Sequence, residues 1–134
     1  MLSSSCYAES WKVSKVKDSW GQSYKVAMIK NNNYVFQIET LLYTFGTLIV
    51  PSNNLYINSS NNSVIFQVDH KPAFKSAEVH AGGKEFDISL TDQDISFLKE
   101  GNVLKIEYQI QNGTSTIVTF SLNNSFNALS EIGL

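Results

Sequence analysis

Two pairs of carboxylate and imidazole side chains are the only groups in this sequence that suggest chemistry. Asp69 and His70 are adjacent, and Glu78 and His80 are two residues apart, so they share one face of a predicted strand. A metal or acid–base site needs such ligands to converge. The structural alternative is stronger, because Asp69 to Pro72 also fits a turn in which Pro72 sets the bend. Glu78 and His80 equally fit the solvated face of an edge strand, so a metal-assisted hydrolase is our least favoured interpretation.

No nucleophile, phosphate loop or cofactor motif accompanies these residues. The sequence has no G-x-S-x-G elbow, and its one cysteine, Cys6, lies in the N-terminal segment. Gly82-Gly83-Lys84 lacks the upstream glycine and the following Ser or Thr of a P-loop, so we interpret it as a hairpin turn. We therefore expect a protein that is not an enzyme and that holds no cofactor and no metal.

The residues 18–22, Asp-Ser-Trp-Gly-Gln, place Trp20 in a predicted loop between two strands. Such an indole either folds over the end of the sheet as a lid or projects as a contact for a partner. We expect the lid, because tryptophan is highly buried on average. Because Trp20 could instead project toward a partner, we name Trp20, Asp69 and His70 as the candidate binding residues.

A different class of function would be a small apolar-ligand carrier. In that hypothesis the ligand would occupy a barrel interior, and the aromatic residues of the first half would line it. They are Tyr34, Phe36, Tyr43 and Phe45. The competing interpretation is that these residues fill a solid core.

Composition and charge limit the partners. The chain has 134 residues, a net charge of −2 and ten basic residues, all lysines that form no cluster along the sequence. These features predict neither nucleic-acid binding nor attraction to anionic lipid. No apolar run reaches the roughly 20 residues of a membrane span, so we expect no such span. After these classes are set aside, we expect the partner to be a protein. We also consider a homodimer that pairs through a strand edge.

The first eight residues differ from the rest. Residues 6–8, Cys-Tyr-Ala, have the small-x-small pattern that signal peptidase cleaves. We interpret residues 1–8 as the remnant of a signal peptide, with a disordered N-terminus as the alternative, and residues 9–134 as one domain. The first interpretation predicts export to the periplasm or the cell surface.

Strand patterns recur about every ten residues before the first helical pattern, which is typical of a sandwich or barrel. Residues 41–50 are apolar on both faces, so they form either one central strand or two strands kinked at Gly46. The fold class is all-β, a single antiparallel β-sandwich or distorted barrel with two short helices near the C-terminus. The predicted strands are residues 11–17, 24–30, 34–40, 55–57, 64–68, 74–79, 86–89, 103–110 and 117–122, with a turn at Asn31 to Asn33.

The C-terminal third carries the clearest local signals. Thr91 and Asp94 predict a capping box for a helix that ends before a left-handed Gly101. A three-residue loop, 111–113, sets Leu104 opposite Phe120 and keeps the apolar faces together, which a two-residue turn would not. Asn124 and Ser125 can cap a last helix, 125–132, whose inward residues would be Phe126, Leu129 and Ile132.

Several segments together resemble the invasion-associated locus B family, a group of small exported bacterial proteins. They are Trp11-Lys12-Val13, residues 64–72 with Asp69 before the proline, the helix and stop at 91–101, the strands 103–108 and 117–122, and Phe126-Asn127-Ala128-Leu129. An exported family associated with type VI secretion shares the opening, the aspartate turn and the strand pair. Family members commonly carry paired cysteines, whereas this chain has none after Cys6.

The resemblance implies an envelope location and a link to host-cell invasion. It supplies no catalytic residues to transfer to this chain. Together with the missing reaction motifs, it favours a non-enzymatic interaction protein.

Overall fold

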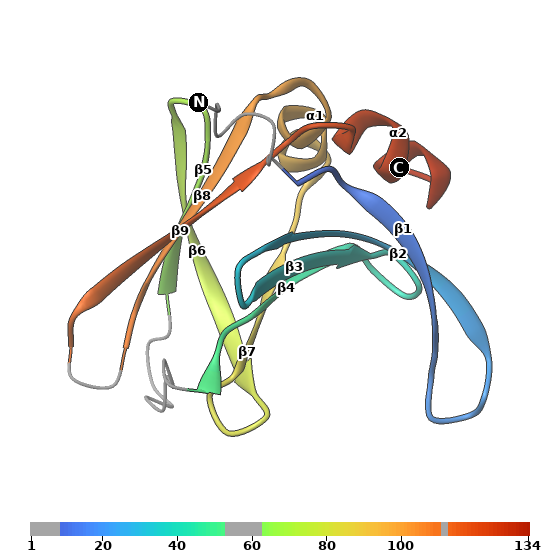
Figure 1. The fold of residues 1–134 in the computed structure, drawn as a ribbon, viewed down its shortest axis with the longest axis horizontal. Helices are drawn as coiled ribbons and strands as arrows, with labels where there is room; N and C mark the ends of the chain where they lie inside the picture. The colour runs from blue at the N-terminus through green and yellow to red at the C-terminus, as the bar shows by residue number, and fades with distance from the viewer. Residues whose placement is uncertain (1–8, 53–62, 111–112) are drawn as a thin grey trace.

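The structure is a computed structural model and describes residues 9–52, 63–110 and 113–134. The predicted strand at 55–57 lies outside these residues. Within them the elements are, in chain order, β1 Lys12–Lys17, β2 Ser23–Asn31, β3 Tyr34–Glu39, β4 Phe45–Ile49, β5 Ser63–Val68, β6 Lys71–His80, β7 Glu85–Ser89, α1 Asp92–Glu100, β8 Val103–Gln109, β9 Ser115–Ser121 and α2 Ser125–Glu131 (Figure 1).

The nine strands form one antiparallel sheet in the order β1-β2-β3-β4-β7-β6-β5-β8-β9. Strand β6 belongs to two halves, because Lys71 to Ser76 pair with β5 and Ala77 to His80 pair with β7. Half A consists of β1, β2, β3, β4, β7 and the C-terminal part of β6, and half B consists of the N-terminal part of β6 with β5, β8 and β9. Figure 1 shows the two halves diverging from β6, with α1 and α2 at one end. This arrangement confirms the all-β prediction with two short C-terminal helices.

The outer strands of the sheet, β1 and β9, are not paired to each other, but hydrogen bonds from β2 and from the residue before β1 reach β9 and the segment after it. Asn31 Nδ2 donates to the carbonyl oxygen of Thr119 at 2.5 Å, and the backbone N–H of Trp11 donates to Asn123 at 2.9 Å. These bonds hold half A against half B, so the sheet has the shape of a distorted and unclosed barrel.

The core lies between the two halves and follows the strand alternation. Phe36 is at its centre, where its ring centroid lies 6.2 Å from that of Trp11 and 6.1 Å from those of Phe66 and Phe120. A Cβ on Gly46 of β4 would collide with the Phe36 ring. Gly46 therefore makes room for an aromatic side chain inside one strand. The predicted alternative of a kink at this glycine is wrong.

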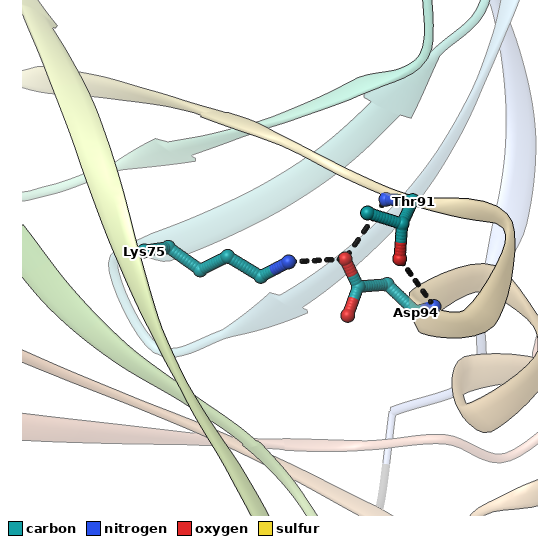
Figure 2. A network of polar contacts seen from close by, with 3 residues as sticks. All are labelled: Lys75, Thr91 and Asp94. Atoms are coloured by element: carbon teal, nitrogen blue, oxygen red, sulfur yellow. Dashed lines mark hydrogen bonds and ion pairs between the residues drawn. The ribbon is translucent and has the colours of Figure 1, made fainter.

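Helix α1 has the predicted start. Thr91 Oγ1 accepts from the N–H of Asp94, and the Asp94 carboxylate accepts from the N–H of Thr91, which completes the capping box. Lys75 of β6 forms an ion pair with the same carboxylate, as Figure 2 shows. Because both side chains are largely buried, this contact fixes the helix start against the centre of the sheet.

Helix α1 ends differently from the prediction. Gly101 has φ −83° and ψ −178°, so it is extended and not left-handed. A Cβ there would lie 2.5 Å from Val68 Cγ1 and 2.9 Å from the carbonyl oxygen of Phe97. The glycine is needed because β5 approaches closely, and its freedom at positive φ is not used.

The β8–β9 hairpin has the predicted register. Leu104 pairs with Phe120, Ile106 with Val118 and Tyr108 with Thr116. Gly113 is left-handed at φ 87°, as the three-residue loop requires, while residues 111 and 112 lie outside the described part of the chain. The register places the apolar face of both strands in the core.

The last helix is confirmed, but its details differ. Leu129 is buried and Ile132 packs against the core, whereas Phe126 is exposed and lies under the ammonium of Lys99 at 4.6 Å. Ala128 takes the inward position. Asn124 is left-handed and makes no capping bond with its side chain. The Asn-Ser pair thus begins the helix by a change in backbone direction.

Candidate functional site

The two histidines lie at opposite ends of one strand. His70 precedes β6 and His80 ends it, so a strand of this length separates them by roughly 30 Å. The hypothesis that Asp69, His70, Glu78 and His80 converge in one metal or acid–base site is therefore wrong. In the part of the chain that the structure describes, no group of three or more His, Cys, Asp or Glu side chains could hold a metal.

Asp69 has a structural role in the β5–β6 turn. Its backbone is left-handed at φ 54°, and its Oδ1 accepts hydrogen bonds from the N–H groups of Asn102 and Val103, both at 3.0 Å. These backbone donors lower the pKa of the carboxyl. Asp69, and not Pro72, therefore makes the turn: Pro72 is paired with Gln67 inside the strand pair. His70 remains exposed beside it.

The second pair belongs to a polar network on the outer face of half A. His80 Nε2 lies 3.0 Å from Asp87 Oδ2 and 3.4 Å from Glu78 Oε1, and Thr47 Oγ1 donates to Asp87 at 2.7 Å. Glu78 and His80 are exposed as expected, whereas Thr47 is buried, and β6 is a central strand and not an edge. Burial, and then the nearby Asp87, raise the pKa of Glu39 on this face. The network joins β4, β7 and β6.

Trp20 projects from the β1–β2 loop. Its side chain is 88% exposed, so the predicted lid is wrong and the projecting alternative is what the structure shows. The loop itself is well ordered by Asp18, whose Oδ1 accepts from the N–H groups of Trp20 and Gln22, both at 2.9 Å. Gly21 is left-handed at φ 80° and completes the turn. The backbone thus holds the indole away from the core.

The β3–β4 loop exposes further apolar side chains at the same end of half A. Leu41 is 55%, Leu42 89% and Tyr43 60% exposed. Both loops lie at this end because β1 to β4 are consecutive antiparallel neighbours. We call residues 18–22 and 40–44 the loop end. The sequence interpretation missed the second loop because it assigned residues 41–50 to a strand, whereas only Phe45–Ile49 is one.

The aromatic residues of the carrier hypothesis do not share an interior. Phe36 is fully buried in the core, while Tyr43 is exposed and stacks on Phe45 at 5.1 Å between centroids. Phe45 and Gly46 are adjacent in β4, so Phe45 faces away from Phe36. Tyr34 receives a hydrogen bond from the buried Tyr108 hydroxyl at 3.3 Å. The predicted lining therefore divides between the two faces of the sheet.

Half B presents an apolar row on the face opposite the core. Register places the side chains of four strands next to one another in the order Phe74, Ile65, Glu107, Ile117. Phe74 is 82% and Ile117 58% exposed. We call these four residues the half-B face. The sequence interpretation missed it, although the alternation Phe74, Ser76 and Glu78 on one strand face could have shown it.

The described residues contain no helix that is long and apolar enough to cross a membrane.

Comparison with known proteins supports the fold. The chain resembles the crystal structure of invasion associated protein B from Bartonella henselae with a TM-score of 0.66 and 17% identity, over 91% of this chain and 89% of that one. No family model matches the chain, and no curated protein matches it. At this identity the likeness shows a common fold, in agreement with the family resemblance inferred from the sequence.

Proposed function

We propose that this chain is an exported, non-enzymatic interaction protein of the bacterial cell envelope that contributes to host-cell invasion. Its protein partner would bind the half-B face. The shared fold with an invasion associated protein supports the invasion link, and the small-x-small pattern Cys-Tyr-Ala at residues 6–8 is the argument for export. The observation that carries the binding role is the exposed apolar row of the half-B face.

The half-B face has the properties of a contact surface. A phenylalanine in the middle of a central strand, 82% exposed, leaves most of its ring in water. Covering apolar area stabilises a complex by about 25 cal/mol per Å² before the costs of association. Glu107 lies between Ile65 and Ile117 and gives the row one charge that can orient a partner.

A homodimer through a strand edge is a weaker form of the proposal. On β9, the carbonyl oxygens of Thr119 and Ser121 already accept hydrogen bonds from Asn31 and Trp11. On β1, lysines occupy three of six positions, and lysines on an edge oppose pairing with another strand. Sedimentation equilibrium tests the dimer: a monomer at micromolar concentration would contradict it.

The test of the binding role is a paired substitution. Phe74→Ser and Ile117→Ser remove apolar contacts from the half-B face, and Phe126→Ser is the control, because Phe126 on α2 is 57% exposed, as Ile117 is 58%, and lies outside this face. After chemical crosslinking in host-cell and envelope extracts, the first two variants should lose a specific adduct that Phe126→Ser keeps. Equal adduct formation by all three, with unchanged folding, would exclude this face.

The test of export is fractionation of the tagged full-length chain in the native bacterium. The protein should accumulate in the periplasmic or surface fraction. Retention in the cytosol with an unprocessed N-terminus would contradict the envelope location, whatever the half-B face binds.

A further inference from the structure

The β1–β2 hairpin extends well beyond the rest of half A. The pairing of β2 with β3 ends at Ala27 and Ile38, whereas β1 and β2 stay paired as far as Lys17 and Ser23. The hairpin therefore continues for about four more residues, or roughly 13 Å. Figure 1 shows it reaching away from the sheet, with its turn at the far tip. Trp20 is in that turn.

One face of this hairpin is basic. Lys15 and Lys25 are directly opposite in register, and Lys17 follows on the same face. Lys25 forms an ion pair with Glu131 of α2 at 3.6 Å, while Lys15 and Lys17 form none with the residues that the structure describes. Like charges directly opposite each other destabilise a strand pair. Lys15 and Lys17 therefore leave positive charge on this face that an anionic partner can neutralise.

The tip of the hairpin and the neighbouring loop are apolar. Trp20 and Leu42 are nearly fully exposed, and Leu41 and Tyr43 are more than half exposed. Tryptophan and tyrosine prefer the interface between lipid headgroups and acyl chains, and leucine partitions into the acyl region. Lysines set back along the strands would reach the phosphate level, since their long side chains extend past apolar groups.

We propose that the loop end docks on the surface of an anionic phospholipid bilayer. Trp20, Leu41, Leu42 and Tyr43 enter the headgroup region, and Lys15, Lys17 and Lys25 contact headgroup phosphates. The apolar side chains project singly from two loops of unequal reach, which suits a soft surface better than the flat, packed centre of a protein interface. This surface is separate from the half-B face, so the chain can bind a membrane and a protein partner together.

The lysines are dispersed along the sequence, which is why the sequence predicted no attraction to anionic lipid. The hairpin register brings three of them to one face. The hairpin, residues 12–31, carries five lysines and one carboxylate, Asp18, which lies in the turn and accepts hydrogen bonds from the N–H groups of Trp20 and Gln22, so positive charge exceeds negative charge along its length.

Vesicle binding by the full-length chain tests the proposal. The chain has two tryptophans, of which Trp11 is 1% and Trp20 88% exposed, so a change in emission on binding reports on Trp20. With vesicles of phosphatidylglycerol and phosphatidylcholine we expect a blue shift, co-sedimentation and quenching by brominated acyl chains. Vesicles of phosphatidylcholine alone should bind at least tenfold more weakly.

Matched variants separate the contributions. Lys15→Gln with Lys17→Gln should weaken binding about 30-fold, the factor for two lysines at about 1 kcal/mol each. Trp20→Ala with Leu42→Ser removes the reporting indole, so its binding is measured by co-sedimentation, which should weaken at least tenfold, and Phe74→Ser should leave vesicle binding unchanged. Absence of binding to anionic vesicles, or binding that neither variant pair weakens, would overturn the proposal. Capture of an acidic protein through the same lysines without vesicle binding would also overturn it, while the half-B face would stay testable by crosslinking.

Discussion

The indole N–H of Trp11 donates a hydrogen bond to the carbonyl oxygen of Ser121, with 2.8 Å between Nε1 and the oxygen. The two residues are 110 positions apart in the sequence. Trp11 precedes β1 and Ser121 ends β9, so this bond joins the two outer strands of the sheet. The same ring packs edge-on against Phe36 at the centre of the core.

The two tryptophans should therefore respond in opposite ways to truncation. Trp11→Ala should lower the free energy of unfolding by about 3–5 kcal/mol, as large core truncations do. Trp11→Phe keeps the ring contact but orphans the Ser121 carbonyl, so it should cost about 1–3 kcal/mol. Trp20→Ala should change stability by no more than about 0.5 kcal/mol. Urea titration measures all three, and a large loss for Trp20→Ala would restore the lid interpretation.

Gly101 gives a second prediction. A glycine that is required because neighbouring atoms lie close should tolerate asparagine less than alanine, whereas a glycine in a left-handed backbone should tolerate asparagine better. Gly101→Ala should cost about 1–3 kcal/mol through overpacking against Val68 and the carbonyl of Phe97, and Gly101→Asn should cost more. At Gly113, which is left-handed with open space around it, Asn should be better tolerated than Ala. Thermal unfolding of the four variants tests this. If Gly101→Asn were more stable than Gly101→Ala, Gly101 would be a left-handed helix cap.

Local signals predicted the fold well where the chain determines its own structure. The capping box of Thr91 and Asp94 uses groups three residues apart, and the β8–β9 register follows from side-chain alternation in two strands joined by a short loop. Gly101 was predicted in the right place for the wrong reason, since Val68, which excludes a side chain there, is 33 positions away. Long-range contacts of this kind are not visible in local patterns.

The candidate site was harder to predict, because exposure depends on tertiary packing. Trp20 and Phe126 have the residue type of core side chains, yet both project into solvent. Conversely, Asp69 and His70 looked available, although the Asp69 carboxylate is occupied by two backbone N–H groups. The hairpin lysines are dispersed in sequence, and only the register of β1 and β2 brings them to one face.

The ion pair of Lys75 and Asp94 supports a third prediction. Their side chains are 16% and 10% exposed, and the Asp94 carboxylate also accepts from the N–H of Thr91. Asp94→Ala removes the carboxylate, which leaves the N–H of Thr91 without its acceptor and the ammonium of Lys75 buried and unpaired, so it should cost about 3–5 kcal/mol. Lys75→Met should cost less, because Asp94 keeps its capping bonds and the methionine fills similar volume.

The double variant Lys75→Met with Asp94→Ala completes a thermodynamic cycle. Its destabilisation should be smaller than the sum of the two single effects by about 1–3 kcal/mol, since no charge is left unpaired. Additive single effects, measured by urea unfolding, would mean that the lysine does not interact with the cap in solution.

Asp69 and Glu39 should give opposite responses to acid. Backbone hydrogen bonds from Asn102 and Val103 lower the pKa of Asp69 from its ordinary value of 3.8. Its contribution to stability is therefore present above about pH 4 and is lost as the pH falls through the lower folded-state pKa. Burial, and then Asp87, raise the pKa of Glu39 from its ordinary value of 4.5. The ionised Glu39 therefore opposes folding, and stability is gained as the pH falls through its raised pKa toward 4.5.

Amide substitutions separate these two carboxylates. Asp69→Asn should destabilise the protein at pH 7, and the difference from wild type should vanish at low pH, where Asp69 is protonated. Glu39→Gln should stabilise the protein at pH 7, and its advantage should disappear once the pH falls below about 4.5. Glu100→Gln, an exposed change of the same charge, is the control for the altered net charge. Urea midpoints between pH 2 and 8 give the comparison, and parallel profiles for all three variants would mean that neither carboxylate is held in its described environment.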